Sequence, residues 1–124
     1  MSVKTILVAD DESHILNVVS LKLRNAGFRV LTARDGQEAL EIATNERPDL
    51  LITDYHMPQL TGIELCRKLR ESSQTASIPA IMLTARGYNL ETDSEESGIR
   101  QLISKPFSPR QLLSAVHEVL GIAA

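Results

Sequence analysis

The chain has 124 residues, 43% of them apolar, which fits one folded domain with its own core and argues against disorder. A net charge of −3 and a pI near 5.6 give no electrostatic reason to expect nucleic acid or an anionic membrane as a direct partner. The one cysteine, Cys66, cannot form an intramolecular disulfide, and we find neither a leader-like segment nor an apolar run of about 18 residues. We therefore expect a soluble cytoplasmic protein consisting of one domain, residues 1–124.

Short apolar runs alternate with helical patterns in the first part of the chain. Lys4–Ala9 is predicted to be a strand, and three acids follow it, Asp10, Asp11 and Glu12. A helix is predicted from Ser13 to a stop near Gly27, with a buried stripe formed by Ile15, Val18, Val19 and Leu23. Arg29–Ala33 is predicted to be a second strand, followed by an Asp-Gly turn and a helix that closes before Pro48 with the stripe Ala39, Leu40, Ile42 and Ala43.

The third apolar run, Leu50–Thr53, suits a short strand buried on both faces, because a parallel strand covered by helices reads as continuous apolar sequence. The run stops at Asp54. Since Met57-Pro58 favours a turn, Asp54 is expected where the strand meets its loop. In open parallel sheets that edge is where ligands bind.

The second part of the chain continues the alternation. A helix is predicted over Gly62–Glu71 and a fourth strand over Ala80–Thr84, and a short or weak helix is predicted in the acidic segment between residues 87 and 98. Gln101–Ser104 is predicted to be the fifth strand. It leads through Lys105-Pro106-Phe107 to a last helix with Ser108 as N-cap, Pro109 in the first helical position, and the stripe Leu112, Leu113, Val116, Val119 and Leu120.

Five strands alternating with five helical segments predict an α/β fold, a doubly wound parallel sheet with helices on both faces. The pattern alone leaves two strand orders open. In either order the ends of the strands place a set of functional groups at one edge of the sheet: Asp10, Asp11, Asp54, Thr84 and Lys105.

The charges of these groups suggest their chemistry. Two carboxylates about 5 Å apart repel by roughly 3 kcal/mol at an effective dielectric of about 20, so three together should raise the pKa of one of them or bind a cation. A divalent cation is the less costly of these two solutions. Oxygen ligands, with no His or Cys set at zinc spacing, indicate Mg²⁺, with Mn²⁺ as an alternative. Asp54 is then a candidate nucleophile for phosphoryl transfer, with the metal and Lys105 neutralising phosphoryl oxygens and Thr84 donating a hydrogen bond. Taken singly, each acid would be interpreted as a helix cap or loop acid.

From Val3 to Leu120 the chain resembles the receiver domains of bacterial two-component response regulators. The motifs that match, in this order, are Asp10-Asp11, Asp35-Gly36-Gln37-Glu38-Ala39-Leu40, Asp54 with Met57-Pro58 and Gly62, Thr84-Ala85, and Lys105-Pro106-Phe107. The resemblance implies a single receiver domain over residues 1–124 with the flavodoxin-like strand order 2-1-3-4-5, for which a chemotaxis receiver is a known example.

The resemblance also implies roles for individual residues. Asp54 is expected to be the phosphoacceptor and, with Asp11, a direct metal ligand, while Asp10 acts through metal-bound water and the backbone carbonyl of His56 completes the coordination. Thr84 and Lys105 are expected to contact the phosphoryl group, Ala85 to leave room for it, and the Lys105-Pro106 bond to be cis. The phosphoryl donor would be a sensor histidine kinase or a histidine phosphotransfer protein. Its transfer would change the surface of the fourth helix, fifth strand and fifth helix, which a partner or output domain reads.

The sequence departs from the family pattern at Leu102, where an aromatic residue commonly couples to the threonine. This departure keeps a second interpretation open, a receiver that is not phosphorylated and acts as a docking module. His56 and Arg86 lie at positions near the expected pocket mouth, where they would tune phosphoryl lifetime.

An enzyme is a further alternative, since an aspartyl phosphate beside Mg²⁺ is also a phosphohydrolase intermediate. The chain lacks the second acid two residues after Asp54 that such an enzyme would use, so we expect no enzyme beyond self-catalysed phosphotransfer and autodephosphorylation. A nucleotide or flavin carrier is disfavoured because no Gly-rich loop follows the first strand.

Overall fold

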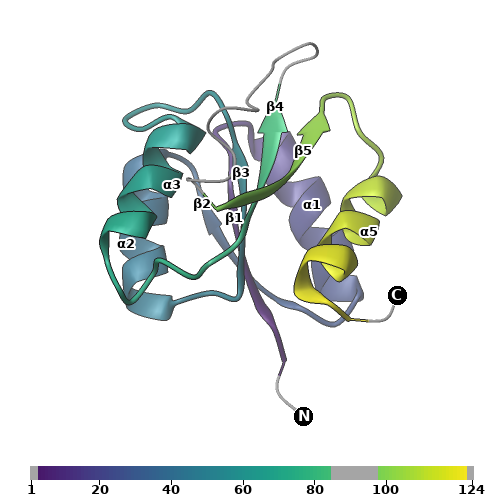
Figure 1. Cartoon of the computed structure of the whole chain (residues 1–124). Coiled ribbons are helices and arrows are strands. Elements are labelled where there is room, and N and C mark those ends of the chain that lie inside the picture. Colours follow the sequence, from purple (N-terminus) through teal and green to yellow (C-terminus); the bar gives the residue numbers. More distant parts are fainter. Residues whose placement is uncertain (1–2, 85–97, 123–124) are drawn as a thin grey trace.

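The computed structural model describes residues 3–84 and 98–122 and shows strands and helices in alternation (Figure 1). The elements in chain order are β1 (Thr5–Ala9), α1 (Ser13–Asn25), β2 (Arg29–Ala33), α2 (Gly36–Glu46), β3 (Leu50–Asp54), α3 (Gly62–Glu71), β4 (Ala80–Thr84), β5 (Ile99–Ser104) and α5 (Pro109–Leu120). The helix predicted between residues 87 and 98 lies outside the described residues, apart from Gly98. Among the described helices, none has the length and apolar character needed to cross a membrane.

The five strands form one parallel sheet in the order β2-β1-β3-β4-β5. The predicted fold class, and the strand order implied by the family resemblance, are confirmed. Helices α1 and α5 cover one face of the sheet, and α2 and α3 cover the other (Figure 1). The central strands are therefore enclosed on both sides.

Successive side chains of β1 and β3 pack into different cores, which explains why both strands are continuously apolar. Ile6 and Ile52 belong to the core under α1 and α5, whereas Leu7 and Leu51 belong to the core under α2 and α3. Cys66, on α3, is fully buried in the second of these cores, and burial raises the pKa of its thiol to about 12. Every residue of β3, from Leu50 to Asp54, is buried.

Side-chain caps fix the starts of three helices. The Asp35 carboxylate accepts a hydrogen bond from the Glu38 N–H at the start of α2. Thr61 and Glu64 form a reciprocal capping box at the start of α3. The Ser108 hydroxyl accepts from the Gln111 N–H with Pro109 in the first turn, as the sequence predicts.

Three boundaries or faces differ from the sequence prediction. β3 includes Asp54 as its last residue, and β5 begins at Ile99, two residues earlier than predicted. On α1, Val18 is 36% exposed and Leu16 occupies the core in its place. The α1 stripe was misplaced because apolar residues at positions 15, 16, 18 and 19 are compatible with two overlapping helical faces.

Candidate functional site

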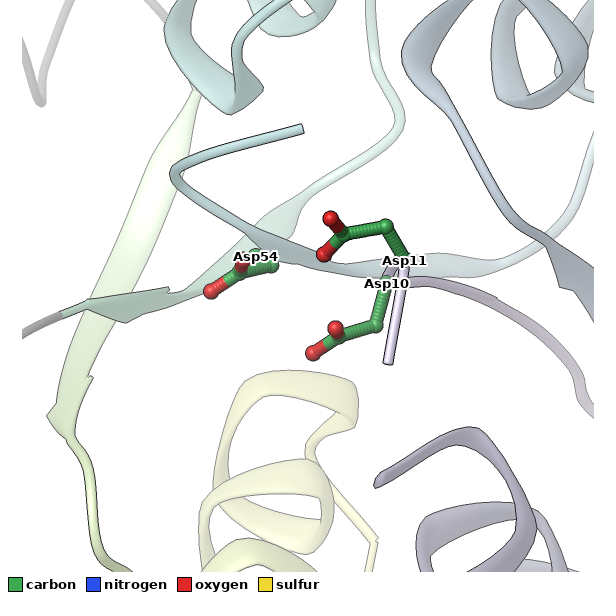
Figure 2. Close-up of side chains that lie close together, drawn as sticks. All are labelled: Asp10, Asp11 and Asp54. Atoms are coloured by element: carbon green, nitrogen blue, oxygen red, sulfur yellow. The ribbon is translucent and has the colours of Figure 1, made fainter. Parts of the chain in front are cut away.

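Three carboxylates meet at the carboxyl edge of the sheet. Asp10 and Asp11 directly follow β1, and Asp54 ends β3, which pairs with β1 in parallel, so the two strands deliver their acids to the same edge. One carboxylate oxygen from each acid lies within 4.8 Å of those of the other two (Figure 2). Asp10 is fully buried, Asp54 is 7% exposed and Asp11 is exposed. The sequence prediction of a three-acid cluster is therefore matched by the geometry.

The backbone holds Asp10 in place. Its N–H donates to the Ala33 carbonyl at 3.1 Å, and its Oδ1 accepts from the Glu12 N–H at 2.9 Å. Burial raises the pKa of the Asp10 carboxyl above its ordinary value, and the charge of Asp54 adds to this rise, while the Glu12 N–H and Lys105 oppose it. The ionised form of Asp10 is thus kept at a cost in free energy.

Among the described residues, Lys105 is the cation that contacts the acid cluster. Its Nζ lies 2.9 Å from Asp54 Oδ1, 3.3 Å from Asp10 Oδ2 and 3.4 Å from Glu12 Oε1. Burial alone would lower the pKa of the ammonium group, but the hydrogen bond to Asp54 and the charges of Asp10 and Asp54 outweigh it and raise the pKa. Lys105 is therefore protonated at neutral pH and bound to the acid cluster. The Lys105-Pro106 bond is cis, as expected.

Thr84 and His56 lie around this centre. Thr84 ends β4, is buried, and its carbonyl accepts from the Lys105 N–H at 2.9 Å, so β4 and the lysine loop are joined at the edge. His56 is exposed in the loop after β3 and lines the cavity beside Asp11 and Asp54. Ala85 and Arg86, which the sequence analysis also named, lie outside the described residues.

The loop between β3 and α3 closes tightly over the end of β3. The Tyr55 N–H donates to the Leu83 carbonyl, and the Gly62 N–H donates to the Tyr55 carbonyl, each at 2.8 Å. A β-carbon on Gly62 would lie 2.5 Å from the Asp54 carbonyl oxygen, so only glycine allows this approach. The loop residues that flank His56 are consequently fixed to the strand ends.

A cavity of about 730 Å³ opens beside the acids. Asp11, Asp54, His56 and Lys105 lie at its polar part. A mainly apolar wall is formed by residues of α1, of the segment before α5 and of the start of α5, namely Ile15, Val18, Val19, Pro106, Phe107 and Pro109. The exposure of Val18 is explained by this position. Sequence reasoning missed this wall because it assigned Val18 to the core.

Two further features of the site were not predicted. The ion pair of Glu12 with Lys105 joins residues 93 apart in the chain, and its only sequence signal is a third acid after Asp10-Asp11. Leu102, at the position where an aromatic was expected, is 38% exposed on the edge strand β5 and pairs in register with Met82.

The donor set suits a hard divalent cation. Three carboxylates supply only oxygen, and the described residues place four acids, including Glu12, and one ammonium group at the site, so these residues carry more negative than positive charge. The Asp10, Asp11 and Asp54 cluster is thus able to bind a metal ion.

The chain matches known proteins over nearly its full length. Residues 6–117 match the family model described as the response regulator receiver domain. The phosphate regulon transcriptional regulatory protein PhoB of Pseudomonas aeruginosa is 40% identical over 94% of this chain and 52% of its own length. The alkaline phosphatase synthesis transcriptional regulatory protein PhoP of Bacillus subtilis is 41% identical over 94% of this chain and 48% of its own. The chain spans about half the length of these curated relatives.

Solved structures agree with this family. The chemotaxis response regulator CheY4 of Vibrio cholerae superposes with a TM-score of 0.88 at 35% identity, covering 95% of this chain and 99% of that one. The receiver domain of a sensor histidine kinase from Pseudomonas aeruginosa, with magnesium coordinated in its active-site cleft, superposes with a TM-score of 0.86 at 26% identity, covering 97% and 99%. The chain therefore belongs to the response regulator receiver domain family.

Proposed function

We propose that Asp54 accepts a phosphoryl group from the phosphohistidine of a sensor kinase or phosphotransfer protein in a Mg²⁺-dependent reaction, and that the chain relays this state through its surface. The observation that carries the proposal is the ion pair of 2.9 Å between Lys105 Nζ and Asp54 Oδ1 inside a cluster of three acids. It supports the proposal because a carboxylate, a cation and oxygens able to bind a metal lie together there.

The acid cluster fits Mg²⁺. Two oxygens bound to one Mg²⁺ are at most about 4.2 Å apart, because each bond is about 2.1 Å long. The spread of up to 4.8 Å between the acids suits two direct ligands and one acid acting through water. We assign the direct roles to Asp11 and Asp54, with the His56 carbonyl as a third protein ligand. We assign the water-mediated role to Asp10, because its carboxylate already binds Lys105 and the Glu12 N–H. Mn²⁺ would fit the same oxygens.

The transfer itself needs one nucleophile and stabilised phosphoryl oxygens. A carboxylate oxygen of Asp54 forms the new O–P bond as the P–N bond of the donor phosphohistidine breaks, and the imidazole leaves with that electron pair. Mg²⁺ held by Asp11, Asp54 and the His56 carbonyl would supply positive charge opposite the phosphoryl oxygens. Lys105 pairs with a phosphoryl oxygen once the Asp54 oxygen it now contacts is esterified, and the Thr84 hydroxyl donates a hydrogen bond to another.

The direct test is the intact mass of the chain after incubation with acetyl phosphate, with and without Mg²⁺. We expect one phosphoryl adduct that requires Mg²⁺ and is absent in Asp54→Asn. Asp49→Asn is a suitable control, because Asp49 accepts from the Thr5 N–H at the opposite edge of the sheet and should leave the adduct unchanged. An adduct that persists in Asp54→Asn would contradict the proposed acceptor.

A second candidate function, favoured by Leu102, is a docking receiver that is not phosphorylated. Leu102 lacks the aromatic ring expected at this position and is partly exposed on β5. Failure of every donor, including a panel of kinases, to modify a chain that binds Mg²⁺ would support this candidate. Repeated turnover of ordinary phosphomonoesters would instead identify a phosphohydrolase.

The domain or protein that responds to phosphorylation depends on whether the chain is part of a longer regulator. In a longer regulator, as in the transcriptional regulators it resembles, the receiver would act on an output domain. As an isolated chain it would act on a protein partner or pass the phosphoryl group onward. We propose no direct nucleic-acid contact by residues 1–124, given their net charge of −3.

A further inference from the structure

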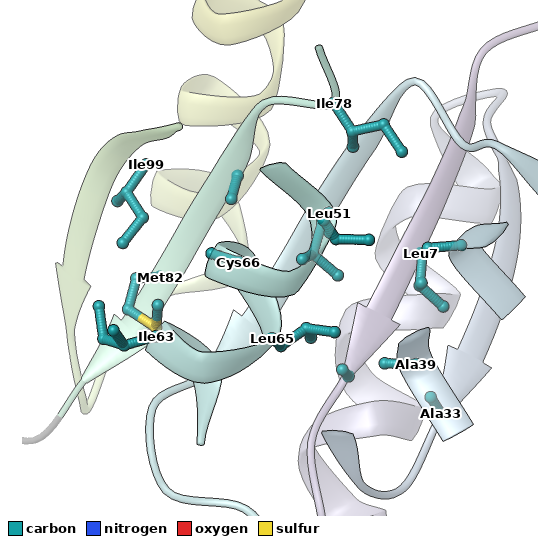
Figure 3. Packing of buried hydrophobic residues seen from close by; sticks show 14 of the residues in the cluster. Leu7, Ala33, Ala39, Leu51, Ile63, Leu65, Cys66, Ile78, Met82 and Ile99 are labelled. Carbon is teal, nitrogen blue, oxygen red and sulfur yellow. The ribbon is translucent and has the colours of Figure 1, made fainter. Parts of the chain in front are cut away.

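A buried hydroxyl lies directly before the acceptor. Thr53 is fully buried on the face of β3 that packs under α2 and α3, where its sheet neighbours Ala9 and Met82 and the strand residue Leu51 are apolar. Figure 3 shows Leu51 and Met82 in this core. Burying a hydroxyl among apolar groups is unfavourable unless the hydroxyl is hydrogen-bonded. A valine would fill the same space and would need no hydrogen bond. The role of the Thr53 hydroxyl therefore has to be found in its contacts.

The Thr53 hydroxyl faces two acceptors, both next to the site. Its Oγ1 lies 3.0 Å from the Asp54 carbonyl oxygen and 3.8 Å from Met57 Sδ. Because a hydroxyl has one proton, it donates to one of these atoms and stays in polar contact with the other. The contact connects the strand residue before the acceptor to the loop residue that follows His56.

The same carbonyl is also the point where the loop closes. Gly62 packs against the Asp54 carbonyl oxygen, and Met57 is buried in the cluster that contains Ile63 and Met82. The peptide after Asp54 is thus held between the Thr53 hydroxyl and Gly62. A small rotation of this peptide would move the Asp54 carboxylate and the His56 carbonyl relative to one another.

We propose that Thr53 is a positioning residue of the site: its hydroxyl fixes the Asp54 peptide and Met57, and thereby brings the Asp54 carboxylate and the His56 carbonyl to one metal ion. This inference rests on the proposed Mg²⁺ site. It differs from a purely structural role, since it assigns the hydroxyl an effect on metal affinity rather than on folding.

The test is Mg²⁺ binding by unphosphorylated chain, measured by titration calorimetry, for the wild type, Thr53→Val and Thr53→Ser. Valine keeps the shape and removes the donor, so the Kd is expected to rise about three- to tenfold, the range of one lost hydrogen bond. Serine restores the hydroxyl and is expected to bring the Kd back to within about twofold of the wild type. Thr53→Ala serves as a second variant if valine does not fold.

A matched control separates positioning from stability. The Thr75 hydroxyl is also buried and donates to a backbone carbonyl, that of Leu69 at 2.7 Å, but it lies in the α3–β4 connection at the other edge of the sheet. Thr75→Val is expected to lower the free energy of unfolding and leave the Kd for Mg²⁺ unchanged. Thr53→Val is expected to raise the Kd for Mg²⁺, whatever its effect on the free energy of unfolding.

A second readout needs no metal. The chain has three methionines, and the ε-methyl NMR signal of Met57, assigned with Met57→Leu, is expected to shift in Thr53→Val and not in Thr75→Val. A wild-type Kd for Mg²⁺ in folded Thr53→Val would overturn the inference. Failure of the wild type itself to bind Mg²⁺ would overturn both the proposed function and this inference, and it is seen before any variant is compared.

Discussion

Gly62 lies against the backbone of Asp54, and a β-carbon at Gly62 would meet the Asp54 carbonyl oxygen at 2.5 Å and Met82 Sδ at 2.7 Å. The methionine end can move, but the carbonyl belongs to a central strand. Substitution at Gly62 should therefore displace the acceptor strand, the loop, or both.

Gly62→Ala is expected to lower the free energy of unfolding by about 1–3 kcal/mol, as overpacking of a core does, and to abolish or slow formation of the phosphoryl adduct. Urea unfolding and intact mass measure the two effects. Gly27→Ala is the control: Gly27 has a φ of 100°, and no atom of the described residues beyond its chain neighbours lies within 4 Å of its β-carbon position, so this variant is strained but should keep the adduct. Normal stability in Gly62→Ala would contradict the close approach.

Replacing Lys105 removes the only ammonium group that the described residues place on the acid cluster. Lys105→Met is expected to lower the free energy of unfolding in EDTA by about 1–3 kcal/mol, because buried Asp10 and Asp54 lose their counter-ion. Mg²⁺ should recover most of this loss, since the ion supplies the missing charge. Urea unfolding of the wild type and of Lys105→Met, with and without Mg²⁺, measures the difference. Equal stabilisation of the two proteins by Mg²⁺ would show that the ion does not replace the charge of the ammonium group.

The raised pKa of Asp10 gives a prediction with a definite sign. Burial disfavours the ionised form of Asp10, so the folded protein favours the protonated carboxyl. The resulting contribution to the free energy of unfolding is complete below the ordinary pKa of an aspartate, near 4, and is lost as the pH rises through the higher pKa of the folded state. Metal-free Asp10→Asn should therefore be more stable than the wild type at pH 7, and this advantage should vanish in acid. Unfolding curves in EDTA from pH 3.5 to pH 7, a range set by these pKa values, test it. A stability advantage independent of pH would refute the assignment.

Two serines should respond to alanine with opposite signs. The Ser20 hydroxyl on α1 is buried and has no hydrogen-bond partner among the described residues, so Ser20→Ala is expected to stabilise the protein by about 1 kcal/mol. Ser108 caps α5, and Ser108→Ala should destabilise it by about 1 kcal/mol. Thermal unfolding of both variants provides the comparison, and a loss of stability in Ser20→Ala would show that its hydroxyl is bonded in solution.

The sequence was informative where local chemistry determines structure. Asp54 was placed correctly because a buried parallel strand is apolar until it reaches its edge, and Ser108-Pro109 marked a helix start by capping alone. β5 was harder to delimit: it is an edge strand with exposed Arg100 and half-buried Gln101, so its first half reads as a loop.

Long-range relationships were not available from the sequence. Nothing local indicates that Glu12 meets Lys105, because that contact depends on how the strands are ordered. The approach of Gly62 to Asp54 depends instead on how the loop between β3 and α3 closes. The strand order itself came from resemblance to a family rather than from the pattern. The interpretation of Thr53 likewise needed the fold, since a threonine in a strand is unremarkable by its propensity.

The ion pairs of Lys105 with Asp10, Asp54 and Glu12 give the site a tethered counter-ion. A metal ion entering this pocket would have to compete with an ammonium group held there at high effective concentration, so metal uptake would be an exchange rather than a simple addition. The affinity of the pocket for metal would then depend on the reach of one side chain as well as on the acids themselves.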